Sequence, residues 1–169
     1  MTKPVNSGWS DLREAQRLAV LGDKAAGLAV TIDAGENDDI HPPNKQIIGR
    51  RLARLARNLV YKQNVTPNGP IIISATRSNR GIVMRFGGID GRLIARSGTS
   101  PIAFETCASD QSSCRFVDTV IEGDTIILRP ADADASAVRR VRYCWGDAPV
   151  CNLYDAAGLP AGPFDVDIQ

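Results

Sequence analysis

The sequence has almost no histidine, no long hydrophobic run and almost no net charge. His41 is the only histidine among 169 residues, and the formal net charge at pH 7 is +1. A charge this close to zero argues against a strong role in binding nucleic acids or anionic membranes. No apolar run approaches the roughly 18 residues that a membrane-spanning helix needs. The first residues also lack the apolar stretch of a signal peptide, which indicates either a cytoplasmic protein or a missing N-terminal segment.

The four cysteines do not have the C-x-x-C spacing of zinc or thioredoxin-type sites. They form two pairs, Cys107/Cys114 and Cys144/Cys151, with six residues between the members of each pair. Strand-like sequence flanks both pairs, so each pair could close a hairpin-like loop with a local disulfide. Such bridges would suit an oxidising compartment. The alternative is four small buried thiols.

The N-terminal part, residues 1–64, predicts a helix, a strand and a second helix. Ser10 is expected to cap the first helix and Gly22 to end it. The run 28–33 is apolar at nearly every position, which suits a strand buried on both faces of a parallel sheet. Asn44 is expected to cap the second helix, after two prolines have held the chain extended.

The second helix should be amphipathic. Its apolar stripe consists of Ile48, Leu52, Leu55 and Leu59. Four arginines lie largely away from that stripe: Arg50, Arg51, Arg54 and Arg57. They could bind an anionic ligand, but we expect them to form a solvated helix face.

The C-terminal part, residues 65–169, predicts an all-β domain of the sandwich type, joined to the first part by a linker at 66–69. Short β-rich runs alternate with turn signals, as in β-sandwiches. The expected strands are 70–75, 81–86, 92–95, 102–106, 115–121, 125–129 and 138–143.

One strand and two helices cannot form a complete sheet, because the strand edges and the helix stripes would stay open to water. Residues 1–64 therefore resemble the last strand–helix unit of a larger α/β domain. We expect this unit to dock on polypeptide outside the chain, on another copy or on the β domain. Docking on the β domain would use Tyr143, Trp145 and Tyr154, and the remaining apolar surface would drive self-association.

His41 is the first candidate for chemistry. It follows the predicted strand, and Asp38 and Asp39 precede it, which is where open α/β sheets place functional residues. Imidazole is well suited to moving protons near neutral pH. The alternative is a loop histidine that only caps or packs. A metal site built from these three residues is less favoured, because one imidazole without a second imidazole or a thiolate gives zinc few ligands. We expect no cofactor.

Three groups of segments resemble the C-terminal portion of the sialate O-acetylesterases, which are SGNH hydrolases. The most specific elements are Ile40-His41-Pro42 and Cys151-Asn152-Leu153-Tyr154. The other matching segments are 9–16, 27–33, 39–46, 49–52, 141–143 and 158–164, together with Trp145 and Pro149. The resemblance implies a fold class of an α/β fragment, the last strand–helix unit of an SGNH-type hydrolase domain, followed by the β-sandwich-like domain.

In such enzymes a serine attacks the acetyl ester, a histidine in the last loop activates the serine, and a carboxylate often orients the histidine. The resemblance therefore implies that the chain belongs to a carbohydrate (sialate) O-acetylesterase with His41 as general base. In SGNH hydrolases the aspartate usually lies three residues before the histidine, which indicates Asp38 as the orienting carboxylate. The Asp-Ile-His motif of the sialate O-acetylesterases indicates Asp39 instead. At most one of them should touch the imidazole, and Asp38 is slightly favoured. The full protein is expected to be periplasmic or secreted and to act on an acetylated sugar.

The sequence departs from this family in lacking the Gly-Asp-Ser segment and, before the run 28–33, a Gly-x-Asn-Asp segment. None of the serines weighed as nucleophiles stands in the context of a nucleophile elbow. These serines are Ser7, Ser10, Ser74 and Ser78. We therefore expect the chain to hold the acid–base half of an esterase and to be inactive without its nucleophile half.

The alternative function is a non-catalytic carbohydrate-binding or interaction module built on the β-sandwich. Aromatic side chains could stack on sugars there, although packing at the junction with a hydrolase domain is the more expected role. The aromatics concerned are Tyr143, Trp145, Tyr154 and Phe164.

Overall fold

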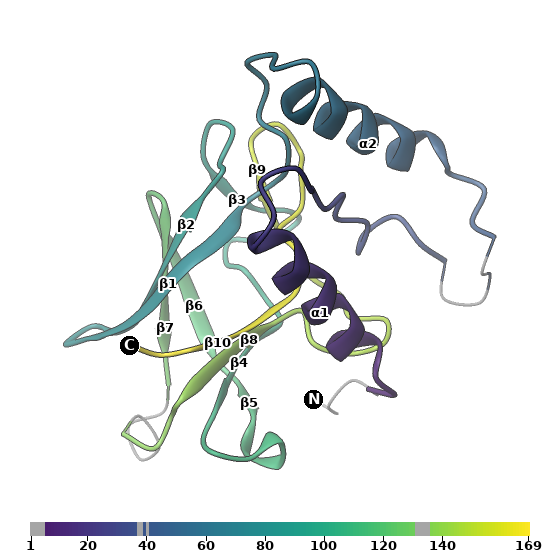
Figure 1. Ribbon diagram of the computed structural model, residues 1–169. Coiled ribbons are helices and arrows are strands. Elements are labelled where there is room, and N and C mark those ends of the chain that lie inside the picture. The colour runs from purple at the N-terminus through teal and green to yellow at the C-terminus, as the bar shows by residue number, and fades with distance from the viewer. Residues whose placement is uncertain (1–5, 37–38, 40, 131–135) are drawn as a thin grey trace.

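The computed structural model describes residues 6–36, 39, 41–130 and 136–169, and in these the chain forms two helices followed by ten strands (Figure 1). Helix α1 is Trp9–Leu21 and helix α2 is Gln46–Leu59. All the strands follow α2 in the sequence and pair antiparallel. The structure is therefore mostly β-sheet. Neither helix within the described residues is long and apolar enough to cross a membrane.

The strands form two four-stranded sheets and one two-stranded sheet. The first has the order β1 (Ile71–Ser78), β2 (Gly81–Gly87), β7 (Thr125–Arg129) and β6 (Asp118–Glu122). The second has the order β10 (Phe164–Asp167), β8 (Arg140–Tyr143), β4 (Phe104–Cys107) and β5 (Arg115–Phe116). The third pairs β3 (Leu93–Ala95) with β9 (Leu153–Asp155).

The two larger sheets share one hydrophobic core. Along β2, burial alternates so that Ile82, Met84 and Phe86 point inward, as expected for a strand with one face on a core. The second sheet supplies Phe104 and Phe164, and the rings of Phe86 and Phe164 lie 6.1 Å apart. These contacts place residues of both sheets in the same core.

Strands occur in all seven predicted β regions, but the region 115–121 is divided. Its first residues form β5 beside β4, whereas its later residues form β6 beside β7. Between them the Val117 N–H donates to the Phe104 carbonyl as the chain passes from one sheet to the other. The sequence analysis missed β9 and β10, which are three and four residues long.

The expectation of a regular strand at 28–33 is wrong for this structure. The segment is not assigned as a strand, and no described strand pairs with it. It still lies against residues 65–169, which we call the β portion of the chain. Ile32 packs against the core, and the Val30 side chain approaches Gly162. An apolar run predicts a buried strand, but a strand also needs a neighbour to accept its backbone hydrogen bonds.

Both predicted helix caps differ from the structure, whereas the predicted end of α1 is confirmed. Gly8 precedes α1, and Ser10 lies inside the helix with its side chain fully buried. Lys45 precedes α2, and its side chain makes no capping hydrogen bond, so Asn44 is not the cap. Gly22 ends α1 as predicted.

The stripe of α2 is only partly buried. Leu55 is 6% exposed, but Leu52 is 53% exposed. Arg51, which was expected on a solvated face, is 6% exposed and therefore among the most buried residues of the helix. Its partner is described below.

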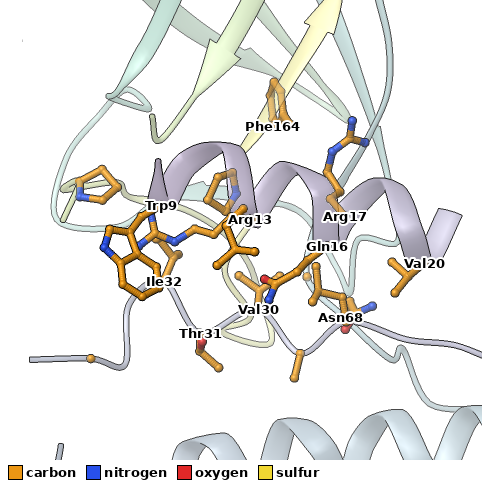
Figure 2. Close-up of a pocket in the computed structure, with 18 of the residues that line it drawn as sticks. Trp9, Arg13, Gln16, Arg17, Val20, Val30, Thr31, Ile32, Asn68 and Phe164 are labelled. Carbon is orange, nitrogen blue, oxygen red and sulfur yellow. The ribbon is translucent and has the colours of Figure 1, made fainter. Parts of the chain in front are cut away.

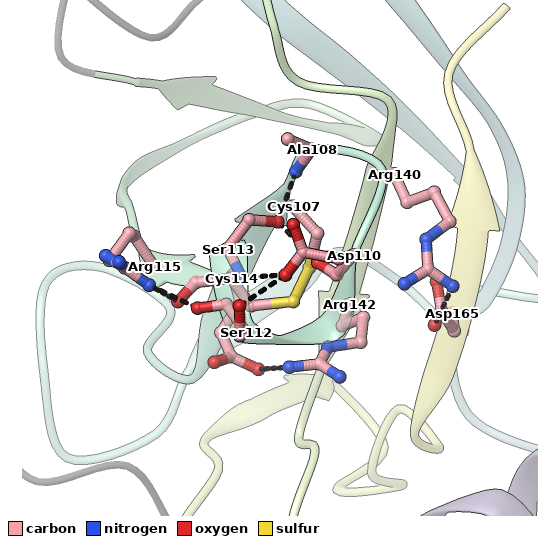
Figure 3. Close-up of a disulfide and its surroundings, with 11 residues drawn as sticks. Cys107, Ala108, Asp110, Ser112, Ser113, Cys114, Arg115, Arg140, Arg142 and Asp165 are labelled. Atoms are coloured by element: carbon pink, nitrogen blue, oxygen red, sulfur yellow. Dashed lines mark hydrogen bonds and ion pairs between the residues drawn. A yellow bond between two sulfur atoms is a disulfide. The ribbon is translucent and has the colours of Figure 1, made fainter.

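Both predicted disulfides are present. The Cα atoms of Cys107 and Cys114 lie 4.0 Å apart, and those of Cys144 and Cys151 lie 5.7 Å apart. Figure 3 shows the first bridge enclosing a short turn, in which the Asp110 side chain accepts a hydrogen bond from the Ser113 N–H.

Candidate functional site

His41 lies on the loop 34–45, of which residues 34–36, 39 and 41–45 are described, between the segment 28–33 and α2. The residue is exposed, and its backbone N–H donates to Asp39 Oδ1 at 2.7 Å. Asp38, the other predicted carboxylate, lies outside the described residues. The Lys45 ammonium donates to the Pro42 carbonyl at 2.8 Å further along the loop. The structure thus gives Asp39 a contact with the backbone of His41, and His41 itself is exposed.

A buried ion pair closes the base of this loop. Arg51 Nη1 lies 2.5 Å from Asp33 Oδ1, and Arg51 Nη2 lies 2.8 Å from Asp33 Oδ2. The Arg51 and Asp33 side chains are only 7% and 14% exposed. Nη1 also donates to the Val30 carbonyl at 2.7 Å. The pair therefore connects α2 to the segment immediately before the loop.

Tyr154 extends this contact to strand β9. Its hydroxyl donates to Asp33 Oδ2 at 3.1 Å, and the Arg96 guanidinium lies over its ring, 3.8 Å from the centroid. Burial by itself would raise the pKa of the Asp33 carboxyl, but the hydrogen bonds and charge of Arg51, with the Tyr154 bond, hold that pKa below its usual value. Burial and the neighbouring Asp33 carboxylate raise the pKa of Tyr154.

Helix α1 contacts the β portion at a second place. The Ser10 hydroxyl donates to the Gly146 carbonyl at 3.1 Å and accepts from the Gly146 N–H at 2.6 Å. Arg13 donates to the carbonyls of Gly146 and Asp147, each at 2.8 Å. The Ser7 hydroxyl donates to the Asp147 carboxylate. Both serines thus hold α1 in place.

The expected docking through aromatic residues is correct for only part of the set. Tyr154 does contact residues 1–64, through Asp33. Trp145 lines a small pocket together with α1 residues. Tyr143, in contrast, lies in the core, where its hydroxyl accepts a hydrogen bond from the Leu153 N–H. Burial raises the pKa of Tyr143.

A groove of about 850 Å³ separates α1 from the segment 28–36 (Figure 2). Trp9, Gln16 and Val20 of α1 line one side, while Val30 and Ile32 line the other. Asp39 also lines this groove, but His41 does not. The groove is open to solvent and largely apolar, so part of the hydrophobic surface of residues 1–64 faces water.

The aromatic residues considered for sugar stacking are buried. Tyr143 and Phe164 are each 1% exposed, and Trp145 and Tyr154 are each 6% exposed. Sugar stacking requires an accessible ring face. These aromatics therefore pack the protein interior, and the observation weighs against a sugar-binding surface built from them.

The comparison with solved structures finds a carbohydrate esterase. The chain is similar to a carbohydrate acetylesterase from Xanthomonas citri whose crystal structure is known, with 35% sequence identity and a TM-score of 0.86. The match covers 98% of this chain but only 38% of the other chain. No protein-family model matches the sequence, and a search of curated proteins finds no match. The fold is thus like that of one portion of an esterase.

The sequence analysis missed the cluster at the base of the loop. Asp33 had been read only as the end of a strand, and Arg51 as one of several solvated arginines. Tyr154 had been considered for packing or sugar stacking. The available signal was that all three lie in segments carrying the family resemblance, namely 27–33, 49–52 and Cys151–Tyr154.

Proposed function

We propose that the chain forms part of a carbohydrate O-acetylesterase, in which it supplies the general base His41. The similarity to a carbohydrate acetylesterase over 98% of the chain, at 35% identity, is the observation that carries this proposal. The exposure of His41 on a loop that is held at its base supports it, because a general base must reach both substrate and nucleophile.

The reaction proceeds through a serine ester. A serine hydroxyl attacks the acetyl carbonyl while His41 takes its proton, and the sugar oxygen then leaves with that proton. Water, deprotonated by His41, hydrolyses the acetyl-serine to acetate and restores the serine. A positively charged imidazole forms twice in this cycle, so a neighbouring carboxylate would stabilise it.

Asp38 is the carboxylate that we assign to the imidazole. The contact of Asp39 with the backbone N–H of His41 supports this assignment, because that bond gives Asp39 a different task. An aspartate that binds a backbone N–H two residues later stabilises a turn. Asp39 would therefore shape the loop, and Asp38 would orient the ring.

The nucleophile is proposed to come from polypeptide outside this chain. Ser7 and Ser10 are engaged with Asp147 and Gly146, and the Ser78 hydroxyl donates to the Gly81 carbonyl. Ser74 lies within β1, at a shift in its register with β2, and not in a strand-to-helix turn. None of these positions has the exposed strand-to-helix turn of a nucleophile elbow.

The remaining part of the esterase is also the partner that we propose for residues 1–64. The matched chain extends well beyond the aligned portion, since only 38% of it is covered. Large apolar side chains on both helices are exposed, including Leu21 at 59% and Leu52 at 53%. The segment 28–33 lies between those helices without a paired strand. Another polypeptide docking there would complete a sheet and cover the apolar surface.

The substrate is proposed to be an acetylated sugar. The sialate assignment rests on the sequence resemblance alone. A periplasmic or secreted location is proposed with it, and the two disulfides support an oxidising compartment.

Complementation tests the function. The purified chain is assayed with an aryl acetate and with an acetylated sialic acid, alone and after addition of the remaining esterase polypeptide. We expect activity only in the mixture, and we expect His41→Ala to abolish it. Robust hydrolysis by the chain alone, or full activity of the His41→Ala mixture, would contradict the proposal.

A further inference from the structure

We infer that Asp33, Arg51 and Tyr154 form a positioning cluster that fixes the loop bearing His41 and couples it to the β portion of the chain. The inference deepens the proposed function and rests on it for its catalytic consequence. None of the three residues is placed in contact with substrate, so each acts through the loop.

The cluster holds both ends of the loop 34–45. Asp33 immediately precedes the loop, and Arg51 lies in the second turn of the helix that follows it. The two-pronged ion pair between them fixes distance and orientation together, because a planar guanidinium matches the two oxygens of a carboxylate. The additional bond from Arg51 to the Val30 carbonyl sets the direction of the chain as it enters the loop.

Tyr154 makes the arrangement depend on the β portion. Strand β9, which carries Tyr154, is paired with β3, and the Arg96 residue that covers the Tyr154 ring follows β3 directly. The hydroxyl bond to Asp33 therefore connects the loop to a sheet whose backbone is already fixed. This bond adds to the contacts that Ile32 and Val30 make with residues 65–169, and we expect a change in the short β3–β9 sheet to reach the loop through it.

The burial of the ion pair gives the contact its strength. A charged pair that is largely removed from water has no alternative solvent partners, so loss of one member leaves the other uncompensated. The exposed Arg54–Asp90 pair is the natural comparison. Arg54 lies on the same helix and also reaches the β portion, but the Arg54 and Asp90 side chains are 29% and 44% exposed. Within the described residues, Arg54 donates to the Thr66 carbonyl and to Asp90 and not to Asp33.

The single histidine provides a direct test. In a chain purified without a histidine tag, the Cε1–H group of the imidazole gives one proton–carbon NMR signal, which reports the surroundings of His41 without any assay of activity. We expect Tyr154→Phe and Asp33→Asn to move and broaden this signal. Arg51→Lys should do the same, because lysine keeps the charge but cannot form the two-pronged contact. Arg54→Lys should leave the signal unchanged.

Tyr154→Phe carries the test if Asp33→Asn fails to fold, since it removes one hydroxyl from an otherwise intact ring. A His41 signal identical to wild type in folded Tyr154→Phe would overturn the inference. So would an equal change in Arg54→Lys, because that result would indicate general loosening of α2.

A kinetic arm separates this inference from the proposed function. In the complemented esterase, Tyr154→Phe should lower kcat while KM stays near wild type, by up to about 10²-fold for a displaced catalytic group. If the mixture is inactive, or if His41→Ala is fully active, the proposed function fails while the NMR result still decides whether the cluster positions the loop.

Discussion

The carboxylate of Asp39 accepts a hydrogen bond from the backbone N–H of His41, with an N–O distance of 2.7 Å. The bond orients the peptide chain, whereas a catalytic carboxylate would have to orient the imidazole ring. Asn can make the same bond through its side-chain carbonyl, but it cannot supply negative charge. This difference allows the two neighbouring aspartates to be distinguished by substitution.

We predict that Asp39→Asn retains most of the activity of the complemented esterase, whereas Asp39→Ala loses more. Asp38→Asn should reduce kcat by orders of magnitude, because a neutral partner neither stabilises the charged imidazole nor holds the same tautomer. Steady-state kinetics of the three variants would measure this. A larger loss in Asp39→Asn than in Asp38→Asn would exchange the two roles.

The acid stability of the chain should depend on Asp33. Its pKa is lowered in the folded state, so the carboxylate stabilises the fold fully above the unfolded pKa of about 3.9. That contribution is lost as the pH falls through the lower folded value. Asp33→Asn should therefore be less stable than wild type at pH 7, and the difference should shrink in acid.

Asp165 provides a control of opposite sign. Burial raises its pKa despite the neighbouring Arg140, so its contribution to stability grows as the pH falls through the folded value. Asp165→Asn should lose less stability at neutral pH than Asp33→Asn. Urea unfolding midpoints measured from pH 7 into the acid range would test both signs. Parallel pH curves for the two variants would contradict this account.

A second buried ion pair joins Glu105 and Arg142. Removing one partner should destabilise the fold strongly, whereas replacing both by apolar side chains should destabilise it less. Their side chains are 3% and 6% exposed, and Arg142 Nη2 lies 3.0 Å from Glu105 Oε2. The Nε atom of Arg142 is buried without a hydrogen-bond partner among the described residues. Glu105→Ala should lower the free energy of unfolding by about 3–5 kcal/mol, because it leaves the guanidinium uncompensated.

Replacing both partners removes that uncompensated charge. The double variant Glu105→Met with Arg142→Met should be more stable than Glu105→Ala, as found for other buried pairs replaced by apolar side chains. Guanidinium unfolding of the two variants beside wild type measures the difference. A double variant less stable than Glu105→Ala would indicate that the pair contributes more than it costs to bury.

The predictable parts of the fold were those governed by local signals. The hairpin between β1 and β2 turns at Asn79 and Arg80 and enters β2 at Gly81, where φ is 120°. The hairpin between β6 and β7 turns at Gly123, where φ is 62°. Glycine adopts such positive φ values readily, so both turns were readable from the sequence. The alternation of apolar residues then predicted the strands on either side of these turns.

The missed features depend on partners distant in the sequence. Ser10 has the residue type of a helix cap, but the backbone of Gly146 takes its hydroxyl. Arg51 appeared solvated because its helix alone was considered, whereas Asp33 lies 18 positions earlier. The run 28–33 has strand-like composition, but composition cannot supply the neighbouring strand. For the candidate site, sequence indicated His41 and two carboxylates without revealing how the loop is held.

The apolar surface of the two helices should make the isolated chain self-associate. Leu21 and Leu52 are exposed at 59% and 53%, and burying each such side chain is worth about 1.5–3 kcal/mol. Leu52→Lys and Leu21→Lys should each weaken association about tenfold or more, since 1.4 kcal/mol corresponds to a factor of ten. Ile73→Lys is the matched control, because Ile73 is 61% exposed but lies on β1 and does not line the groove beside α1. Light scattering over a range of protein concentrations measures the effect. A monodisperse monomer at every concentration would contradict this prediction. Equal weakening of self-association by Ile73→Lys would show that the helices are not the associating surface.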